Sequence, residues 1–457
     1  MDTKHTRFSY RSLDELRADI ERMGLDIPVS DDLSVLAEPV RIGEKSIPNR
    51  LCVLPMEGRD ASPEGEPTAL SFRRYARFAR GGAGLLWAEA DAVVAEGRSS
   101  PAQFYLNPRT LDSFSRLCTS MDCAARDAYP DNPRFQPYKV LQLTHSGRYS
   151  KPDPNGEAII AAENPFLDPY LPEQSRVISD EELRELIPAY VNAAVLAKRA
   201  GFDAVDLKAC HFYLMSELLG ARTRPGAFGG SFENRRSLLL EILDRIQDKT
   251  GGLDVTLRIS AFDAIPYPYG FGVSEQDPLT PALSEPLELV RLLRERGVRL
   301  LAVSIGDPYY NPHVGRPYDN GFYTPTTHPL ADTARIFRVT RAIQQAVPDV
   351  AVVSTGMGWL REYAANVAAG MIRGGYCTIA GFGRQAFAYP DFARDILLSG
   401  GMQRNKCCTT CSNCTALMRS QRPAGCPIRD REVYGPLLRE MLVERGKIDG
   451  TRVADHV

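Results

Sequence analysis

Four cysteines near the C-terminal end have the spacing of a metal or cluster site. Cys408, Cys411 and Cys414 are each separated by two residues, and Cys426 follows after eleven more. Three thiolates from one loop and a fourth from the next turn can converge on one centre, which fits either zinc or a 4Fe-4S cluster. The spacing leaves these two open, although three close thiols with a distant fourth suit the corners of a cubane. Cys407 remains as a spare thiol.

Two glycine-containing turns have the composition of a phosphate site. In GFGR, at 381–384, two glycines precede an arginine, so backbone N–H groups can approach an anion that the guanidinium also binds. Alone, this segment is better explained as a tight turn with an exposed arginine. With STGMG at 354–358, it matches the phosphate site formed by the last two loops of a barrel. The predicted phosphate-binding residues are Gly356, Met357, Gly383 and Arg384.

Polar side chains also lie at the ends of several apolar runs, where a core would not select them. These side chains are Gln142, His145, Lys208, His211, Tyr213 and Arg258. Such groups indicate a binding or catalytic site if the runs are strands whose carboxyl ends meet.

Eight apolar, β-rich runs supply the strands that must position these residues. They lie at 51–56, 84–93, 139–145, 204–208, 255–260, 299–305, 350–355 and 376–382. Amphipathic helices are expected between them, for example after the capping box of Ser179 and Glu182, ending at Gly201. Strands that are apolar on both faces are typical of parallel sheets covered by helices.

We therefore predict an α/β fold, a (β/α)8 barrel with a C-terminal cysteine-rich segment, for which the resemblance given below implies an iron-sulfur cluster. A doubly wound open sheet is the alternative, although no GxGxxG follows the first run. The expected organisation is a helical extension at 1–35, a barrel at 36–400 and a cysteine-rich segment at 401–457; the family resemblance described below implies an FMN-binding barrel and a 4Fe-4S segment.

Composition and net charge limit the classes of molecule that the protein is expected to bind. The 457 residues are 44% hydrophobic and 25% charged, with a formal net charge of −2, so no electrostatic attraction to nucleic acid or membrane is expected. There is no run of about eighteen apolar residues and no signal-peptide pattern, which predicts a cytoplasmic protein. Small molecules or proteins, including further copies of the chain, are the expected partners.

The sequence resembles the Old Yellow Enzyme family of FMN oxidoreductases over roughly residues 36 to 430. The motifs that carry the resemblance are NRLCVLPM (49–56), GGAGLLWAEADAVVAEGR (81–98), QLTHSGR (142–148), GFDAVDLKACHFYLMSELL (201–219), FGGSFENRR (228–236) and LRIS (257–260).

The resemblance implies flavin contacts for five residues. Pro55, Met56 and Ala90 would line the flavin, Gln142 would bond its pyrimidine edge, and Arg258 would lie beside N1 and O2. A fixed cation there stabilises the negative charge of a reduced flavin. A salt bridge inside the barrel is the structural alternative for Arg258.

The resemblance also implies a substrate site, with one departure. The family motif is His-x-x-His or His-x-x-Asn with Tyr two residues later, whereas this chain has Lys208, His211 and Tyr213. In the family the pair holds a carbonyl oxygen and the tyrosine protonates the α carbon. Lys208 replaces a directional imidazole with a point charge, and it could instead pair with a nearby acid such as Asp206.

For the cysteines, the resemblance favours a cluster over zinc. The branch similar to 2,4-dienoyl-CoA reductase and trimethylamine dehydrogenase carries a 4Fe-4S cluster after the barrel, with cysteine spacing that this chain matches. Only about thirty residues follow Cys426, so electrons are expected to pass through the cluster to or from an external ferredoxin, flavodoxin or electron-transferring flavoprotein. Direct reduction by NAD(P)H stays open.

The expected function is reduction of an activated C=C bond beside a carbonyl or carboxyl group. The alternatives are an amine or C–N dehydrogenase, for which Trp87, Tyr309 and Tyr310 are available aromatic groups, and a zinc-stabilised binding module. The loop at 310–325, with His313, is either a wall of the substrate pocket or a packed surface loop.

Overall fold

Eight parallel strands close into one barrel. The computed structural model describes residues 4–132, 134–153 and 155–446. The strands are β3 (Leu51–Val53), β4 (Leu85–Ala92), β5 (Tyr138–Thr144), β8 (Ala204–Ala209), β9 (Asp254–Ser260), β10 (Leu300–Ser304), β11 (Ala351–Ser354) and β12 (Ile379–Phe382). Neighbours in the chain are neighbours in the barrel, and β12 pairs with β3. All eight predicted runs are strands, so the barrel is confirmed and the open sheet is excluded.

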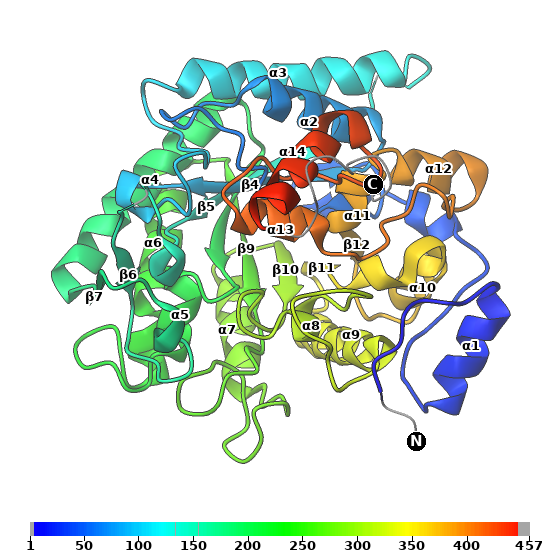
Figure 1. The fold of residues 1–457 in the computed structure, drawn as a ribbon. Helices are drawn as coiled ribbons and strands as arrows, with labels where there is room; N and C mark the ends of the chain where they lie inside the picture. Colours follow the sequence, from blue (N-terminus) through cyan, green and yellow to red (C-terminus); the bar gives the residue numbers. More distant parts are fainter. Residues whose placement is uncertain (1–3, 133, 154, 447–457) are drawn as a thin grey trace.

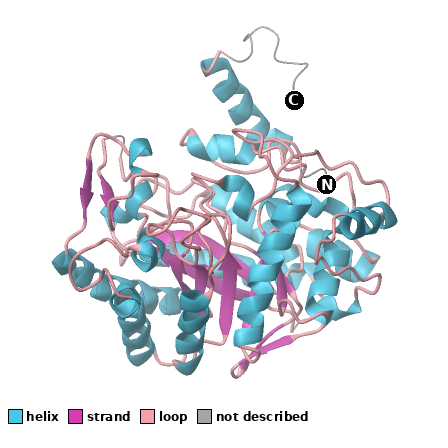
Figure 2. Cartoon of the chain, turned by 90° about the horizontal axis from the view of Figure 1, so that it is seen from below, coloured by secondary structure: helices cyan, strands magenta, loops and turns pink. Residues whose placement is uncertain are grey.

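Helices surround the barrel (Figure 2). The helices of the outer ring are α2 (Ala69–Arg80), α3 (Leu111–Ala128), α4 (Asp180–Ala200), α6 (Phe232–Thr250), α7 (Ser284–Glu295), α9 (Pro329–Ala346), α10 (Ala364–Arg373) and α12 (Phe392–Ser399). The predicted capping box is present at the start of α4, where Ser179 accepts from the backbone N–H of Glu182, and Gly201 ends the helix with a left-handed backbone.

A hairpin of β1 (Val40–Ile42) and β2 (Lys45–Ile47) closes the N-terminal end of the barrel. Its side chains Val40, Ile42 and Ile47 share one buried apolar cluster with residues at the start of the barrel strands. Because this end is filled with apolar groups, only the C-terminal ends of the strands are left to form a polar site.

Short elements lie over the C-terminal ends of the strands. They are α5 (Leu214–Gly220), α8 (Pro312–Gly315), the 3-10 helix η5 (Met357–Tyr363) and α11 (Arg384–Ala388), while β6 (Ala158–Ile160) and β7 (Ser175–Val177) form a separate parallel pair.

The cysteine-rich segment covers the same end of the barrel. It contains α13 (Asn413–Arg419) and is followed by α14 (Arg431–Glu444), which projects from the body of the molecule (Figures 1 and 2). The guanidinium groups of Arg73 and Arg77 on α2 bind the carboxylate of Asp430, at 2.7 and 2.6 Å, and fix the start of α14 to the barrel.

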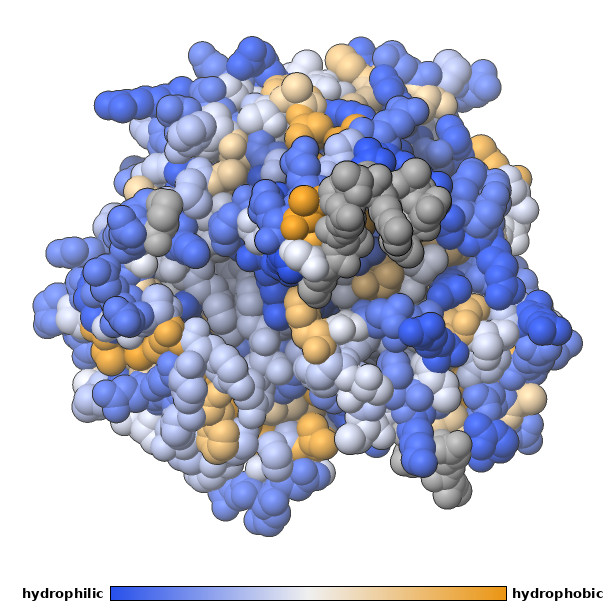
Figure 3. Space-filling view, viewed as in Figure 1, coloured by the Kyte–Doolittle hydropathy of each residue, from blue (hydrophilic) through white to orange (hydrophobic). Residues whose placement is uncertain are grey.

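The N-terminal segment includes the expected helix, α1 (Leu13–Arg22), whose first turn is capped by Ser12. Within the described residues, no helix is long and apolar enough to span a bilayer. The face shown in Figure 3 is largely hydrophilic, with small separated hydrophobic areas.

Candidate active site

One cavity at the C-terminal ends of the strands brings most of the predicted site residues together. Those that line it are Pro55, Met56, Gln142, Lys208, His211, Tyr213, Arg258, Gly356, Met357, Gly383, Arg384 and Cys414. They come from the ends of β3, β5, β8, β9, β11 and β12 and from the cysteine-rich segment. Residues up to 359 positions apart, Pro55 and Cys414, therefore share one cavity, because closure of the barrel makes all strand ends neighbours.

One end of the cavity is built to receive an anion. Arg384 begins α11 directly after Gly383, and its guanidinium donates to the carbonyl of Pro317 at 3.0 Å. Its other terminal nitrogen, Nη1, is buried and has no hydrogen-bond partner among the described residues. Gly356 has a φ of +89°, so the turn that brings the backbone of 356–358 to the cavity needs a glycine.

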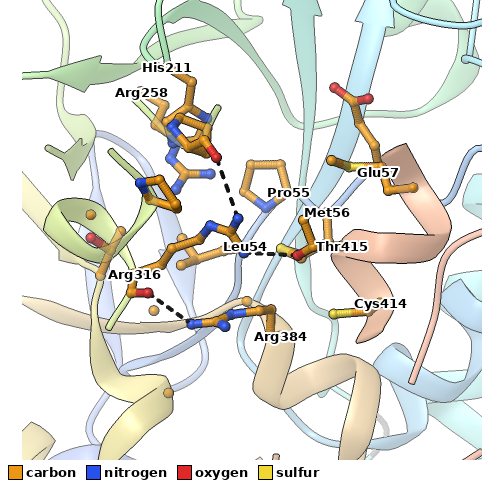
Figure 4. Close-up of a pocket in the computed structure, with 18 of the residues that line it drawn as sticks. Leu54, Pro55, Met56, Glu57, His211, Arg258, Arg316, Arg384, Cys414 and Thr415 are labelled. Atoms are coloured by element: carbon orange, nitrogen blue, oxygen red, sulfur yellow. Dashed lines mark hydrogen bonds between the residues drawn. The ribbon is translucent and has the colours of Figure 1, made fainter. Parts of the chain in front are cut away.

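A second arginine lies beside Arg384 (Figure 4). Arg316 is half-buried and donates to Thr415 Oγ1 at 2.8 Å. Burial and then the charge of Arg384 lower the pKa of Arg316 to about 9. Two half-buried cations that repel each other, beside two glycine turns, favour occupation by a dianion such as a phosphate group.

Arg258 lines the cavity beside His211 (Figure 4). Its Nε donates to Ser304 Oγ at 2.9 Å, and its backbone N–H donates to Asp206 at 2.6 Å. Within the described residues no carboxylate lies within 4 Å of its guanidinium, so the interior salt bridge considered from the sequence is absent. Gln142 also contributes to this region, and its amide Nε2 donates to Asp206 at 2.5 Å.

The other end of the cavity holds a lysine, a glutamate and a tyrosine in mutual contact. Lys208 Nζ lies 3.5 Å from Glu57 Oε1 and 3.3 Å from the centre of the Tyr213 ring. The Tyr213 hydroxyl donates to Glu57 Oε1 at 2.9 Å. Lys208 therefore pairs with Glu57, and not with Asp206, whose carboxylate accepts from Gln142, Trp87 and the Arg258 backbone.

Burial and charge set the protonation of this group. Burial alone would raise the pKa of Glu57, but the charges of Lys208 and Arg59 and the hydrogen bond from Tyr213 outweigh burial and lower it. Burial and then the Glu57 carboxylate raise the pKa of Tyr213 well above its usual value. Burial also lowers the pKa of Lys208, and Glu57 opposes this effect. The site thus combines an ionised carboxylate with a firmly protonated phenol.

His211 enters the cavity from a strained turn. Its φ is +64°, which is rare for a residue with a side chain, and its N–H donates to Ser260 Oγ at 3.0 Å. Burial, followed by the charges of Arg258 and Lys208, lowers the pKa of His211 well below its usual value. The imidazole is therefore neutral at pH 7 and offers one N–H donor.

Several residues of this cavity were not predicted from the sequence. They are Glu57, Arg316 and Thr415, whereas Tyr309, which also lines the cavity, was suggested only as an aromatic group of an amine site. A signal existed for Glu57, because it directly follows the first strand run, and for Arg316, because it lies in the 310–325 loop.

That loop is a pocket wall in part. Pro312, Gly315 and Arg316 line the cavity, whereas His313 bonds Tyr323 at 2.5 Å and lies outside it. Burial lowers the pKa of His313 to about 4.

Some predicted residues lie outside the cavity. Ala90 is buried in β4, where its carbonyl accepts from Gln103 at 3.0 Å, and it does not line the cavity. His145 is buried, with its Nδ1 accepting from the Gly147 N–H. Trp87 is buried and bonds Asp206, so it cannot form part of a cage around a ligand.

The four predicted cysteine ligands are close enough to influence one another. After burial, thiolate charge on Cys408 and Cys414 raises the pKa of Cys426, and Cys414 and Cys411 act in the same way on Cys408. Among the described residues, however, no group of three or more His, Cys, Asp or Glu side chains is arranged to hold a metal ion. The cluster stays a prediction that rests on the spacing and the resemblance.

Comparison with known proteins agrees with this architecture. The family model described as "NADH:flavin oxidoreductase / NADH oxidase family" matches residues 135–398. The NADH oxidase of Thermoanaerobacter brockii is 29% identical over 270 residues, covering 58% of this chain and 38% of that protein. The NADPH dehydrogenase of Bacillus pumilus (strain SAFR-032) is 28% identical over 281 residues, covering 59% of this chain and 73% of the relative.

Solved structures share the fold. A 2-naphthoyl-CoA reductase in complex with 2-naphthoyl-CoA has a TM-score of 0.69 at 19% identity, covering 89% of this chain and 58% of that chain. Histamine dehydrogenase from Rhizobium sp. 4-9 has a TM-score of 0.65 at 20% identity, covering 87% and 52%. The chain thus spans only part of the NADH oxidase and of both these structures. It belongs to the NADH:flavin oxidoreductase / NADH oxidase family, the Old Yellow Enzyme family, and is an oxidoreductase of that family.

Proposed function

We propose that the protein reduces a C=C bond conjugated to a carbonyl or carboxyl group, using FMN held in the barrel cavity. FMN supplies hydride transfer from its reduced ring when it is bound. The residues present fit this cofactor, because the unpartnered Arg384 Nη1, the adjacent Arg316 and the glycine turns form a phosphate cradle. Arg258, which lies on β9, would face the pyrimidine end of the ring.

The observation that carries the proposal is the arrangement of Lys208, His211 and Tyr213 at the far end of the cavity. A neutral His211 and the Lys208 ammonium are donors that can bind a carbonyl oxygen and stabilise the negative charge that develops on it. Tyr213 is a protonated phenol in the same cavity, which suits a proton donor to the α carbon.

The same geometry weighs against amine oxidation. A substrate ammonium would need a free carboxylate or aromatic face, but Lys208 Nζ already lies over the Tyr213 ring and beside Glu57. An internal cation therefore occupies the position that a substrate cation would take. A zinc-stabilised binding module would leave the cavity and its flavin-binding motifs without a role.

For the electron supply, we propose a 4Fe-4S cluster bound by Cys408, Cys411, Cys414 and Cys426, which receives electrons from an external carrier protein. Cys414 lines the cavity itself, so a cluster there would lie close to the flavin. NAD(P)H remains the alternative donor, in keeping with the family.

The test is an anaerobic half-reaction. The enzyme with its flavin reduced is mixed with cyclohexenone, with an enoate and with neither, and flavin absorbance is followed. We expect reoxidation by at least one unsaturated probe. Bleaching of the oxidised enzyme by simple amines, with no reoxidation by either probe, would favour the dehydrogenase instead.

Two variants assign the roles. Tyr213→Phe should keep FMN and flavin reduction but slow reoxidation by about 10²–10⁴-fold, the usual loss for a general acid. Lys208→Met should weaken the binding of the unsaturated probe, because it removes a donor to the developing oxyanion. If Tyr213→Phe reoxidises at the wild-type rate, the tyrosine has no part in the chemistry.

A further inference from the structure

Glu57 is the residue of the cavity whose role is not covered by the reaction proposed above. Its carboxylate is held at both oxygens: Oε1 faces Lys208 and Tyr213, and Oε2 accepts from Ser99 Oγ at 3.0 Å. Arg59, with its Nε 3.9 Å from Oε2, is a second cation beside it. So many fixed contacts on one buried carboxylate in an active-site cavity indicate a group whose position and charge matter.

The hydrogen bonds of Tyr213 have a defined direction. A phenol has one proton, and that of Tyr213 is donated to Glu57 Oε1. The Tyr309 hydroxyl lies 3.3 Å from the Tyr213 hydroxyl and must therefore be the donor in that contact. The chain of donors runs from Tyr309 through Tyr213 and ends on Glu57.

This direction makes Tyr213 a poor acid while Glu57 is ionised. Transfer of the phenol proton to a substrate would leave a phenolate 2.9 Å from a carboxylate, with two like charges in a buried site. If Glu57 carries a proton, it can donate to the Tyr213 oxygen while Tyr213 donates to the substrate. The products of that exchange are a neutral Tyr213 and an ionised Glu57, which is the arrangement that Lys208 and Arg59 stabilise.

We propose that Glu57 is a proton-relay residue, which supplies through Tyr213 the proton that the substrate receives. The inference rests on the proposed function. The atoms and electrons balance as follows: the β carbon gains a hydride from the reduced flavin, the α carbon gains the Tyr213 proton, and Tyr213 regains a proton from Glu57. Glu57 is left as a carboxylate and is reprotonated from solvent before the next turnover.

The surroundings of Glu57 come from five parts of the fold. Lys208 lies on β8, Arg59 follows β3, Tyr213 precedes α5, Tyr309 follows β10, and Glu89 on β4 is a second acid whose charge interacts with that of Glu57. The two cations favour the ionised form and the acid opposes it. A bound substrate oxygen that engages Lys208 would weaken the strongest of these cationic influences on Glu57, so substrate binding itself favours uptake of the proton.

Glu57→Gln is the main test, because its amide oxygen can still accept from Tyr213 but the side chain cannot release a proton. The reduced holoenzyme is mixed anaerobically with the unsaturated probe that reoxidises the wild type. We expect reoxidation about 100-fold slower or worse, with flavin reduction unchanged. Reoxidation by dioxygen, which protonates no carbon, should stay at the wild-type rate. Glu173→Gln, an exposed acid outside the cavity, is the matched control.

The pH profile separates a relay from a structural role. In the wild type the reoxidation rate should fall as pH rises through the Glu57 pKa of the reduced complex, because the donor is its protonated form. Glu57→Gln should lose this dependence, and Glu57→Asp should restore it in part. The double variant with Tyr213→Phe should be no slower than the slower single variant, since the two act as one unit.

If Glu57→Gln fails to retain FMN, Glu57→Gln with Lys208→Met removes both charges and is compared with Lys208→Met alone. The single variant should keep a pH-dependent rate and the double variant should lose it. Wild-type enzyme that no unsaturated probe reoxidises would refute the proposed function. Wild-type reoxidation with an equal rate and equal pH profile in Glu57→Gln would refute the relay alone.

Discussion

At the scale of single residues, the cations of the site differ in whether a carboxylate lies beside them. The Lys208 ammonium is paired with the Glu57 carboxylate, whereas no carboxylate of the described residues lies within 4 Å of the Arg384 or Arg316 guanidinium. Arg258 carries a third uncompensated cation. The two ends of the cavity therefore differ in net charge, and this difference orients a ligand that has a phosphate at one end only.

Removal of Arg384 should weaken FMN binding. Arg384→Ala takes away a charge-assisted contact worth about 1.5–3 kcal/mol, which raises the dissociation constant by about 10–150-fold. Fluorescence titration of the apoprotein with FMN measures it. Arg404→Ala, which removes an arginine paired with Glu362 outside the cavity, should bind as the wild type does. Equal affinities in all three proteins would place the phosphate elsewhere.

Arg258→Ala should change the reduction potential of the flavin and leave the retention of FMN unchanged. A cation near the flavin stabilises the negative charge of its reduced form, so its loss lowers the midpoint potential. Spectroelectrochemical titration of the holoenzyme measures the midpoint potential. The potential of Arg258→Lys should lie between those of the wild type and Arg258→Ala. An unchanged potential with full FMN content would contradict this placement of the guanidinium.

At the scale of elements, the 316–320 loop is clamped between both ends of the chain. Asp319 accepts from the Phe8 N–H at 3.0 Å, from Trp359 Nε1 at 2.8 Å and from Arg361 at 2.5 Å, and its own N–H donates to Thr410 Oγ1. The N-terminal segment and the cysteine-rich segment thus both hold the loop that carries Arg316.

Asp319→Asn should loosen this clamp and weaken FMN binding indirectly. The loss of the ion pair with Arg361 frees the loop, and we expect the FMN dissociation constant to rise by about tenfold, or 1.4 kcal/mol. Asp26→Asn breaks an exposed ion pair with Arg341, away from the cavity, and is the control. If both variants bind FMN equally well, the clamp does not support the cofactor site.

The attachment of α14 should depend on pH. Burial alone would raise the pKa of Asp430, but Arg73 and Arg77 outweigh burial and lower it. A lowered carboxylate pKa contributes stability above the unfolded-state value of about 3.9, and this contribution is lost as pH falls through the folded-state pKa. Hydrogen exchange of α14 should therefore rise below about pH 4 in the wild type. In Asp430→Asn it should already be high at pH 7, unless other contacts hold the helix.

At the scale of the whole molecule, the cysteine-rich segment is a cover on the barrel as well as a proposed cluster site. Cys414, Thr415 and Met418 line the cavity, and the Ala424 N–H donates to the carbonyl of Gly58, next to Glu57. A change in this segment can therefore reach the substrate end of the site.

Protein isolated without oxygen should contain about four iron atoms and four sulfides per chain. Cys411→Ser should lose them and keep most of its FMN, because the flavin contacts come from the barrel strands. Cys407→Ser should keep both, since Cys407 already donates to the Gln403 carbonyl. Iron, sulfide and FMN analyses decide this, and colourless protein with one zinc per chain would overturn the assignment.

The sequence by itself determined the fold and most of the site. Eight apolar runs predicted the eight strands, because parallel strands that are buried on both faces are apolar at nearly every position. Local motifs such as the GFGR turn and the Lys208–Tyr213 segment could also be recognised, because the residues that act together in each motif lie within a few positions of one another. The cysteine spacing likewise predicts a ligand set from residues that are close in sequence, and this set stays a prediction.

Only the tertiary structure decided which side chains of the site contact one another. The sequence suggested Asp206, two residues away, as an alternative partner for Lys208, but the Lys208 ammonium pairs with Glu57, which lies 151 positions earlier. Arg316 reaches Arg384 from a loop 68 positions away, and Ala90 lies outside the cavity that its motif suggested. Barrel closure and loop paths place these groups, because contacts across the mouth depend on strand register and chain route, which no short stretch of sequence records.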